Sequence, residues 1–208
     1  MQMERWFSFS KHSTDNLRVL IKTSDHPSAN NLYGEYTWRC AEVLSAHLAV
    51  NPQIVDGLRV LELGAGTGLC GITAALCGAR WVRFTDHNSA IKANLETNCI
   101  TNGVSNFDFE YLEWNQPTLW PRKDFDVILA SDTLFAKSVY EPFLRTLSLL
   151  LHQQPQTFAL IAVEIRESLT NVAVLMKKYF LECALEHTDK SVSHDSVKLY
   201  RIKAKNSQ

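Results

Sequence analysis

The stretch that decides the fold is VLELGAGTGLCG, residues 60–71, in which an apolar run gives way to a glycine-rich turn. Residues 58–63 predict a short strand that is buried on both faces. Beyond the turn, apolar residues recur at helical spacing up to Gly78, which suits a helix end. This strand, turn and helix are typical of a nucleotide-binding α/β unit. Glycines let the backbone approach a ligand closely, and the start of the helix offers unpaired N–H groups to an anion.

Two acidic residues and the spacing of the glycines indicate which kind of ligand the turn binds. A dinucleotide fingerprint, G-x-G-x-x-G, would need a third glycine at position 69, which is Leu69. Glu62 precedes the turn at a buried strand end, where an acid needs a partner. Asp86 ends the next expected strand, WVRFTD, about twenty residues after Gly66, where an acid accepts hydrogen bonds from a ribose diol. The sequence therefore predicts an adenosine-like ligand.

Two later strands also end in residues that suit a binding site. Trp114 follows a strand expected at residues 107–112, and Asp132 follows one at residues 125–131. Ligands of open parallel sheets bind at the carboxyl ends of the strands, so we expect Trp114 to cover an adenine face and Asp132 to face the reaction centre. The alternative for Asp132 is that it caps the next helix, as acids often do. We favour the functional role, because Pro142 is a favoured first-turn residue and places the helix start later.

The other elements complete an alternating α/β pattern. β-prone runs around Trp6 and Leu17 predict an N-terminal hairpin that covers a sheet or domain edge. A helix is expected from Trp38, with Thr37 as its N-cap; on this pattern alone, Trp38 is a core aromatic. We expect the last two strands to pair antiparallel. Further helices are expected at residues 89–100, 140–152 and 169–180, and further strands at residues 157–167, 181–185 and 197–202.

Four segments together resemble a known family. They are LELGAGTGLCGITAALCGA, TDHN, LEWN and FDVILASDTLF, and the resemblance extends over about residues 34–166. The chain resembles the seven-stranded methyltransferases that use S-adenosylmethionine, and specifically the family 16 methyltransferase-like enzymes that methylate protein lysines. TDHN and SDTLF are similar to the calmodulin-lysine methyltransferase branch. GAGTGL and the Glu-x-Arg at positions 164–166 are as similar to other branches.

The resemblance implies a fold and a set of site residues. The expected fold is a single-domain, Rossmann-like α/β methyltransferase fold with a seven-stranded, mostly parallel sheet and a C-terminal antiparallel hairpin. Residues 1–33 would form an N-terminal hairpin extension, with a helix following it, and residues 34–208 the methyltransferase domain. The family has a comparable arginine at Arg166; the residues alone suggest a solvated ion pair with Glu164. The implied catalytic residues are Asp132 and Phe135, and the implied cofactor-binding residues are Trp38, Glu62, Gly64, Ala65, Gly66, Asp86, Trp114 and Ser131.

The motif at residues 132–135 also bears on the methyl acceptor. Enzymes that methylate amino groups of nucleic-acid bases resemble one another in an acid-or-Asn, Pro, Pro, aromatic motif here, whereas this chain has Thr133 and Leu134. A lysine amine is the expected acceptor, although only about one lysine in a thousand is neutral at physiological pH. An apolar channel lined by Phe135 would lower the pKa of that amine, and Asp132 would orient it or pass its proton to water.

Composition excludes several classes of protein. At 208 residues and 46% hydrophobic content, the chain suits one domain, which argues against a dehydrogenase with a second catalytic domain. Its net charge of −1 shows no basic excess for nucleic acid. Five scattered cysteines without a C-x-x-C fit reduced thiols, so we expect a cytoplasmic protein, with the nucleus as a second compartment. We also expect a monomer. We expect neither a metal site nor a membrane segment.

Three other functions stay open on the sequence. A methyltransferase acting on a small molecule or RNA would share every cofactor residue and differ only on the acceptor side. A non-catalytic module could keep the fold and bind a protein partner, although the glycines, Asp86, Trp114 and Asp132 are all present. A nucleotide-dependent oxidoreductase is the least favoured.

Overall fold

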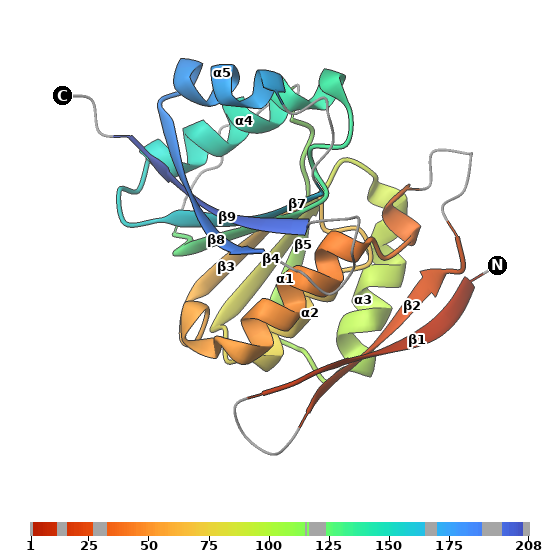
Figure 1. Cartoon of the computed structure of the whole chain (residues 1–208). Coiled ribbons are helices and arrows are strands. Elements are labelled where there is room, and N and C mark those ends of the chain that lie inside the picture. The colour runs from red at the N-terminus through yellow and green to blue at the C-terminus, as the bar shows by residue number, and fades with distance from the viewer. Residues whose placement is uncertain are drawn as a thin grey trace.

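The computed structural model of the chain contains a seven-stranded sheet flanked by helices on both faces (Figure 1). It describes residues 2–11, 16–26, 33–114, 116, 124–164, 170–188 and 197–205. The strand order is β5-β4-β3-β6-β7-β9-β8. The first five strands are parallel, whereas β9 runs antiparallel to both β7 and β8. The strands are β3 (Arg59–Leu63), β4 (Trp81–Asp86), β5 (Phe107–Tyr111), β6 (Val127–Ser131), β7 (Phe158–Glu164), β8 (Leu181–Thr188) and β9 (Val197–Ala204). This architecture confirms the predicted fold class.

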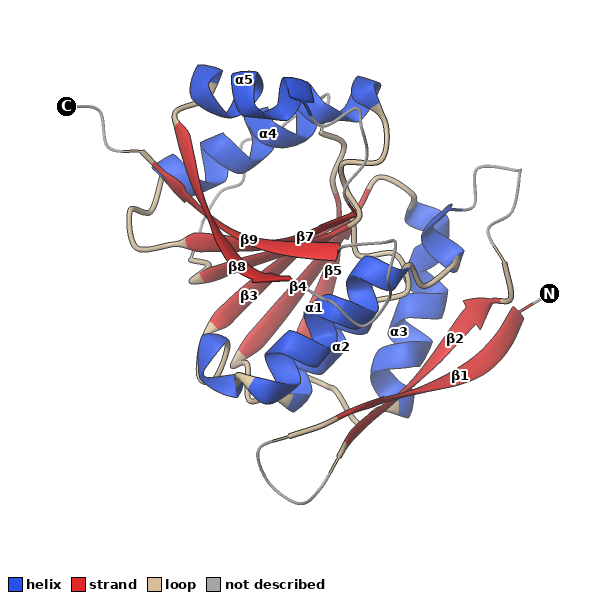
Figure 2. Cartoon of the chain, viewed as in Figure 1, coloured by secondary structure: helices blue, strands red, loops and turns tan. Residues whose placement is uncertain are grey.

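Two helix layers bury the sheet, one on each face (Figure 2). Helices α1 (Arg39–Val50), α2 (Leu69–Leu76) and α3 (Lys92–Thr101) lie on one side, and α4 (Lys137–His152) and α5 (Thr170–Lys178) lie on the other (Figure 1). Strand β6 explains why: Val127 and Leu129 join the core under α1 and α2, and Ile128 and Ala130 join the core under α4. Since alternate residues of a strand face opposite ways, a continuous apolar run needs a cover on both faces. Three short 3₁₀ turns complete the chain: η1 (Tyr33–Glu35), η2 (Pro52–Ile54) and η3 (Ser89–Ile91).

The N-terminal hairpin forms a separate two-stranded sheet outside α3 (Figure 1). Its strands are β1 (Gln2–Phe9) and β2 (Leu17–Ser24), and Phe7, Val19 and Ile21 are buried against the helix layer. The predicted hairpin is therefore present. The division of the chain at residue 33 stays a prediction, because residues 27–32 lie outside the described part.

Three asparagines of α3 attach the hairpin to the domain. Asn94, Asn98 and Asn102 are four residues apart and so share one face of the helix. Asn102 accepts a hydrogen bond from Leu20 N–H (2.9 Å) and donates one to Leu20 O (2.7 Å). Asn98 accepts from Lys22 N–H (2.8 Å), and both Asn98 and Asn94 donate to Lys22 O (3.3 and 3.0 Å). This asparagine ladder gives the outer edge of β2 the partners that another strand would supply.

The prediction of Thr37 as the N-cap of α1 was wrong. The helix begins at Arg39, Trp38 holds the N-cap position, and no side chain caps the first turn. The Thr37 hydroxyl instead bonds Thr23 Oγ1 (3.1 Å) and Thr67 Oγ1 (2.9 Å). These bonds join the hairpin, the start of α1 and the glycine turn, and they come from residues that are distant in sequence.

The prediction that the helix after Asp132 starts near Pro142 was also wrong. Helix α4 begins at Lys137, and Pro142 lies inside it. The buried ring of Tyr140 packs with Phe143 in the core under α4, and this packing outweighs the one backbone hydrogen bond that proline removes. The helix expected at residues 169–180 ends earlier, at Lys178, and Phe180 follows it and is exposed. The expected positions of Arg166 and Leu169 lie outside the described residues.

Candidate active site

The glycine turn between β3 and α2 bends through left-handed backbone conformations. Gly64, Gly66 and Gly68 have φ angles of +68°, +54° and +84°, which other residues adopt only with strain. Ala65 N–H donates to Thr85 O (2.9 Å), and Gly68 N–H donates to Ala65 O (2.9 Å). The predicted strand, turn and helix are all present, and the turn is fixed by its own backbone hydrogen bonds.

Three other segments of the chain lie close to the backbone of the turn. A Cβ placed on Gly66 would lie 3.3 Å from Gly34 O, in the segment before α1. A Cβ placed on Gly64 would lie 3.2 Å from Thr133 Cγ2 and 3.5 Å from the Trp114 ring. The structure thus brings the predicted residues Gly64, Gly66 and Trp114 together. Side chains at the two glycine positions would crowd the neighbouring segments.

Asp86 fixes the turn from the end of β4. Its side chain is almost buried, and its Oδ2 accepts a hydrogen bond from Gly66 N–H (3.1 Å). The Oδ1 atom accepts from Asn88 N–H (2.9 Å) and lies 3.2 Å from Nδ1 of His87, whose pKa the hydrogen bond to Asp86 raises. A carboxylate can accept about four hydrogen bonds, so acceptor capacity remains for the hydroxyls of a ribose.

Glu62 lies beneath the turn and is only 1% exposed. Its Oε2 accepts a hydrogen bond from Gly71 N–H (2.9 Å). A Cβ on Gly71 would lie 2.2 Å from Phe84 Cε1 and 2.7 Å from this oxygen, so only glycine fits there. Burial raises the pKa of Glu62 to about 8, which leaves the carboxyl mostly protonated at neutral pH. As placed, Glu62 supports the start of α2, and a direct contact with a ligand stays a prediction.

Ser131 and Cys70 join the same region from the neighbouring strand. Ser131 ends β6, and its Oγ accepts a weak hydrogen bond from Cys70 Sγ (3.6 Å). Burial raises the pKa of Cys70 well above its ordinary value, so the sulfur remains a thiol. Ser131 therefore lies beside α2 and next to Asp132, on the strand adjacent to the turn.

Asp132 takes a strained position at the end of β6. Its φ angle is +52°, which is uncommon for residues other than glycine. Among those residues, Asp and Asn adopt it more often than most. Its N–H donates to Ala162 O of β7 (3.0 Å), so the backbone is held to the neighbouring strand. Ala136 holds the N-cap position of α4, and Asp132 is therefore not the cap of that helix. Glu164 ends β7 at the same edge of the sheet.

Four aromatic rings gather between the segment before α1 and the loop that follows β6. Trp38 lies 5.2 Å from Tyr36 and 6.3 Å from Tyr33, measured between ring centroids, and Tyr33 lies 6.0 Å from Phe135. The sequence predictions included Trp38 and Phe135 but missed Tyr33, which lies between them. The available signal was the cluster YGEYTW at residues 33–38, directly before a helix.

Two further side chains complete the description of the site. The Trp114 ring packs edge-on against Phe143 (5.0 Å between centroids), which directs it over Gly64. Thr133 is buried, and its hydroxyl has no hydrogen-bond partner within the described residues. A buried hydroxyl of this kind calls for an explanation, and here it lies beside the turn.

The described residues contain no group of three or more metal-ligating side chains that could hold a metal ion. Among them, no helix is long and apolar enough to cross a bilayer.

A family model described as lysine methyltransferase matches residues 21–187. The histone-arginine methyltransferase METTL23 of Xenopus laevis is 32% identical over 158 residues, which cover 74% of this chain and 67% of that protein. The protein N-lysine methyltransferase METTL21A of Danio rerio is 35% identical over 62% of this chain and 60% of its own length. The calmodulin-lysine N-methyltransferase of Arabidopsis thaliana is 36% identical over 59% of this chain and 42% of its own length.

Solved structures share the fold at low sequence identity. A putative RNA methyltransferase from Pyrococcus horikoshii superposes with a TM-score of 0.66 at 16% identity, over 89% of this chain and 93% of that chain. The putative methyltransferase SMU.776, complexed with SAH, superposes with a TM-score of 0.65 at 13% identity, over 90% of this chain and 54% of that chain.

Proposed function

Because the chain belongs to the family of lysine methyltransferases, we propose that the carboxyl edge of its sheet transfers a methyl group from S-adenosylmethionine to a lysine amine of a protein. The observation that carries this proposal is the order of three strand ends. Asp86 at β4, the glycine turn at β3 and Asp132 at β6 follow one another in the sheet. The ligand-fixing acid and the acceptor-side acid thus flank the turn.

The residues of the turn fit an adenosyl group with its amino-acid tail. Gly64 and Gly66 let Trp114 and Gly34 approach the backbone of the turn closely, and Asp86 retains acceptor capacity toward a ribose. Trp114, over Gly64, would cover the adenine, and Trp38 would close the opposite side. Ala65 and Ser131 complete the set at the ends of the two adjacent strands, with Glu62 acting from beneath.

On the acceptor side, this chain's residues would bind the lysine and manage its proton. The cofactor supplies an electrophilic sulfonium methyl group when bound. A protonated lysine cannot attack it, and the cost of the neutral form is about 4 kcal/mol at physiological pH. Phe135 offers an apolar surface that lowers the pKa of the amine, and Asp132 would orient the amine and pass its proton to water.

Arginine is the second candidate acceptor, because relatives at about 30% identity are named histone-arginine methyltransferases. A guanidinium keeps its proton at all relevant pH values. Methyl transfer to arginine therefore depends more strongly on a carboxylate partner than transfer to lysine does. Asp132 and Glu164 lie at the ends of neighbouring strands and could supply that partner.

The test is incubation with tritium-labelled S-adenosylmethionine and three acceptor samples: a methyltransferase-depleted lysate, core histones and calmodulin. Labelled bands are then hydrolysed in acid. Recovery of methyl-lysine supports the proposal, and methyl-arginine alone would replace lysine with the second candidate. Label only in RNA or small molecules would refute a protein acceptor, and cofactor binding without any transfer would indicate a partner-binding module.

We further propose that the enzyme works as a monomer in the cytoplasm and, as a second compartment, in the nucleus. Cys70, Cys77 and Cys99 are buried free thiols, which suits a reducing compartment. Light scattering of the purified chain and fractionation of cells test the two parts separately.

A further inference from the structure

Tyr33 exposes an aromatic ring beside Phe135. The two side chains leave 47% and 44% of their surface accessible, although large aromatic residues are mostly covered. They come from distant parts of the chain, the 3₁₀ turn η1 and the loop between β6 and α4. The backbone of Tyr33 is fixed by the Trp38 side chain, because Trp38 Nε1 donates a hydrogen bond to Tyr33 O (3.1 Å).

Tyr33, Trp38 and Phe135 form one aromatic wall. The Tyr33 and Phe135 rings have centroids 6.0 Å apart and an interplanar angle of 33°, and the Tyr33 and Trp38 rings are 6.3 Å apart at 36°. Rings this close touch each other, so a side chain cannot pass between them and must lie across their exposed faces. Tyr33 is the middle ring of the wall, between the residue expected at the cofactor and the residue expected at the acceptor.

The chemistry of the wall matches a long basic side chain. Aromatic faces attract cations that lie within about 6 Å of the ring centroid, and they also pack against methylene groups. A lysine supplies four methylenes and a cation. Asp132 begins the loop that carries Phe135, three residues earlier in the chain.

We propose that Tyr33 is a specificity-determining residue, whose ring binds the ammonium group of the incoming lysine while Phe135 packs against the methylene stem. This inference rests on the function proposed above. The ammonium contact is made before the amine loses its proton, so it contributes to binding of the acceptor and does not itself assist the methyl transfer.

The experiment measures binding of Nα-acetyl-lysine methylamide by NMR titration, with the protein saturated with S-adenosylhomocysteine. Its neutral counterpart, Nα-acetyl-norleucine methylamide, reports the stem without the charge. Tyr33→Ala should weaken binding of the lysine probe about tenfold, and Tyr33→Phe, which keeps the ring, should stay within about twofold of the unchanged protein. Phe180→Ala is the matched control, because it removes an exposed ring at the start of β8, at the opposite edge of the sheet.

Several outcomes would overturn the inference. Equal affinity of Tyr33→Ala and the unchanged protein would remove Tyr33 from the acceptor site, and so would the absence of binding by the unchanged protein. Equal affinity for the lysine and norleucine probes would remove the ammonium contact. Loss of S-adenosylhomocysteine affinity in Tyr33→Ala would assign the ring to the cofactor instead. The titration needs no methyl transfer, so failure of the proposed function in the tritium assay is seen separately.

Discussion

The two sides of the candidate site differ in how their residues are held. On the turn side, Glu62 and Asp86 are buried, and their carboxyl oxygens accept hydrogen bonds from backbone N–H groups of the turn and of α2. On the acceptor side, Tyr33 and Phe135 expose almost half of their surface. The comparison suggests a division of labour: one side is fixed to receive the same cofactor at each turnover, and the other is open to a large partner.

The first way to break this comparison is to remove the acid of the open side. We expect Asp132→Asn to lower kcat about a hundredfold or more, because the amide cannot take up a proton from the amine. Asparagine tolerates a positive φ, so the backbone at the end of β6 is kept. Cofactor affinity should stay within about twofold. The measurement is steady-state kinetics on an acceptor that the tritium assay labels, together with calorimetry for S-adenosylmethionine.

The matched control is Asp126→Asn, at the opposite end of the same strand. Asp126 Oδ2 accepts a hydrogen bond from Arg59 N–H (2.8 Å), which an asparagine oxygen can also accept. We expect this variant to keep the activity of the unchanged protein. If Asp132→Asn also keeps its kcat/KM, Asp132 has no part in moving the proton.

The second change removes the acid of the closed side. Asp86→Ala should weaken S-adenosylmethionine binding by about tenfold to a hundredfold, because it loses the ribose contact and frees Gly66 N–H. The affinity of Asp86→Asn should lie between those of Asp86→Ala and the unchanged protein, since its amide oxygen can still accept the hydrogen bond from Gly66 N–H. Calorimetry gives both affinities. An unchanged affinity in Asp86→Ala would contradict the ribose assignment.

The closed side could be predicted from the sequence because its signals are local. The glycine spacing, the apolar strand before it and Asp86 at the end of the next strand all lie within residues 58–86, and the structure places each in the expected element. The function of Glu62 could not be worked out so fully. Its partner, Gly71 N–H, lies in the first turn of α2, and only glycine fits there because Phe84 and Glu62 occupy the space of a Cβ.

The open side was harder to predict because it is assembled from distant segments. Tyr33 meets Phe135 across about a hundred residues, and aromatic residues by themselves favour a core role. Thr37 shows the same limit. Its position before a helix is typical of an N-cap, yet tertiary contacts with Thr23 and Thr67 take its hydroxyl.

The third prediction concerns the closed side again, where Glu62 should make the unfolding free energy depend on pH. The folded pKa of Glu62 is raised to about 8 from an ordinary value of 4.5, so the folded state holds a proton that the unfolded state has lost. The contribution to stability is present in full below pH 4.5 and is lost as pH rises toward 8. Relative to Glu62→Gln, the unchanged protein should lose at most about 1.4 kcal/mol of unfolding free energy for each pH unit in this range. Urea denaturation at several pH values measures it, and parallel stability curves would show that Glu62 is ionised in the fold.

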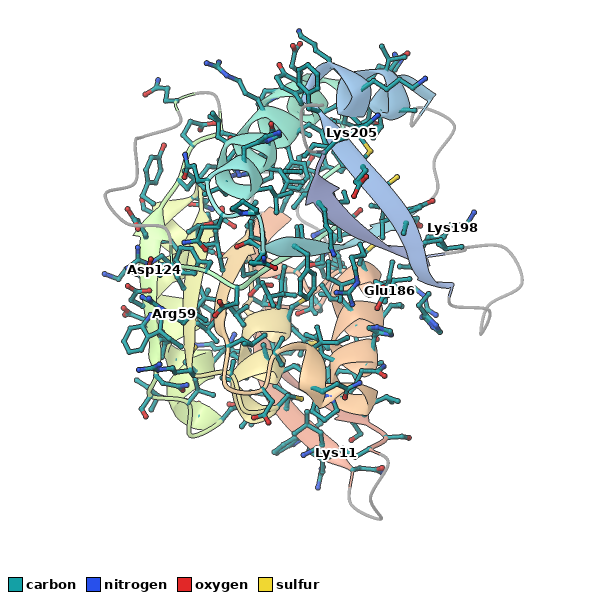
Figure 3. The ribbon with its side chains drawn as sticks, turned by 90° about the vertical axis from the view of Figure 1, so that its left-hand side faces the viewer. Lys11, Arg59, Asp124, Glu186, Lys198 and Lys205 are labelled. Carbon is teal, nitrogen blue, oxygen red and sulfur yellow. The ribbon has the colours of Figure 1, made fainter. Side chains whose placement is uncertain are left out.

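The smallest effect is expected at the amino ends of the strands, away from both sides of the site. Arg59 and Asp124 lie side by side in Figure 3 and form an exposed ion pair, with Nη1 and Oδ2 3.0 Å apart. Arg59→Ala should change the unfolding free energy by less than about 1 kcal/mol, because solvent screens exposed pairs. Cofactor affinity should not change. A large loss of affinity would mean that the two edges of the sheet are coupled.

The asparagine ladder of α3 has a consequence for solubility. A free strand edge is a row of unpaired N–H and C=O groups on which another chain can add a strand. On β2, the groups of Leu20 and Lys22 are directed away from β1 and are occupied by Asn94, Asn98 and Asn102. Asparagine is a poor helix former, costing up to about 0.7 kcal/mol relative to alanine at Asn94 and at Asn98 inside the helix. Helix α3 thus gives up some helical stability to close an edge through which hairpins of separate molecules could otherwise join.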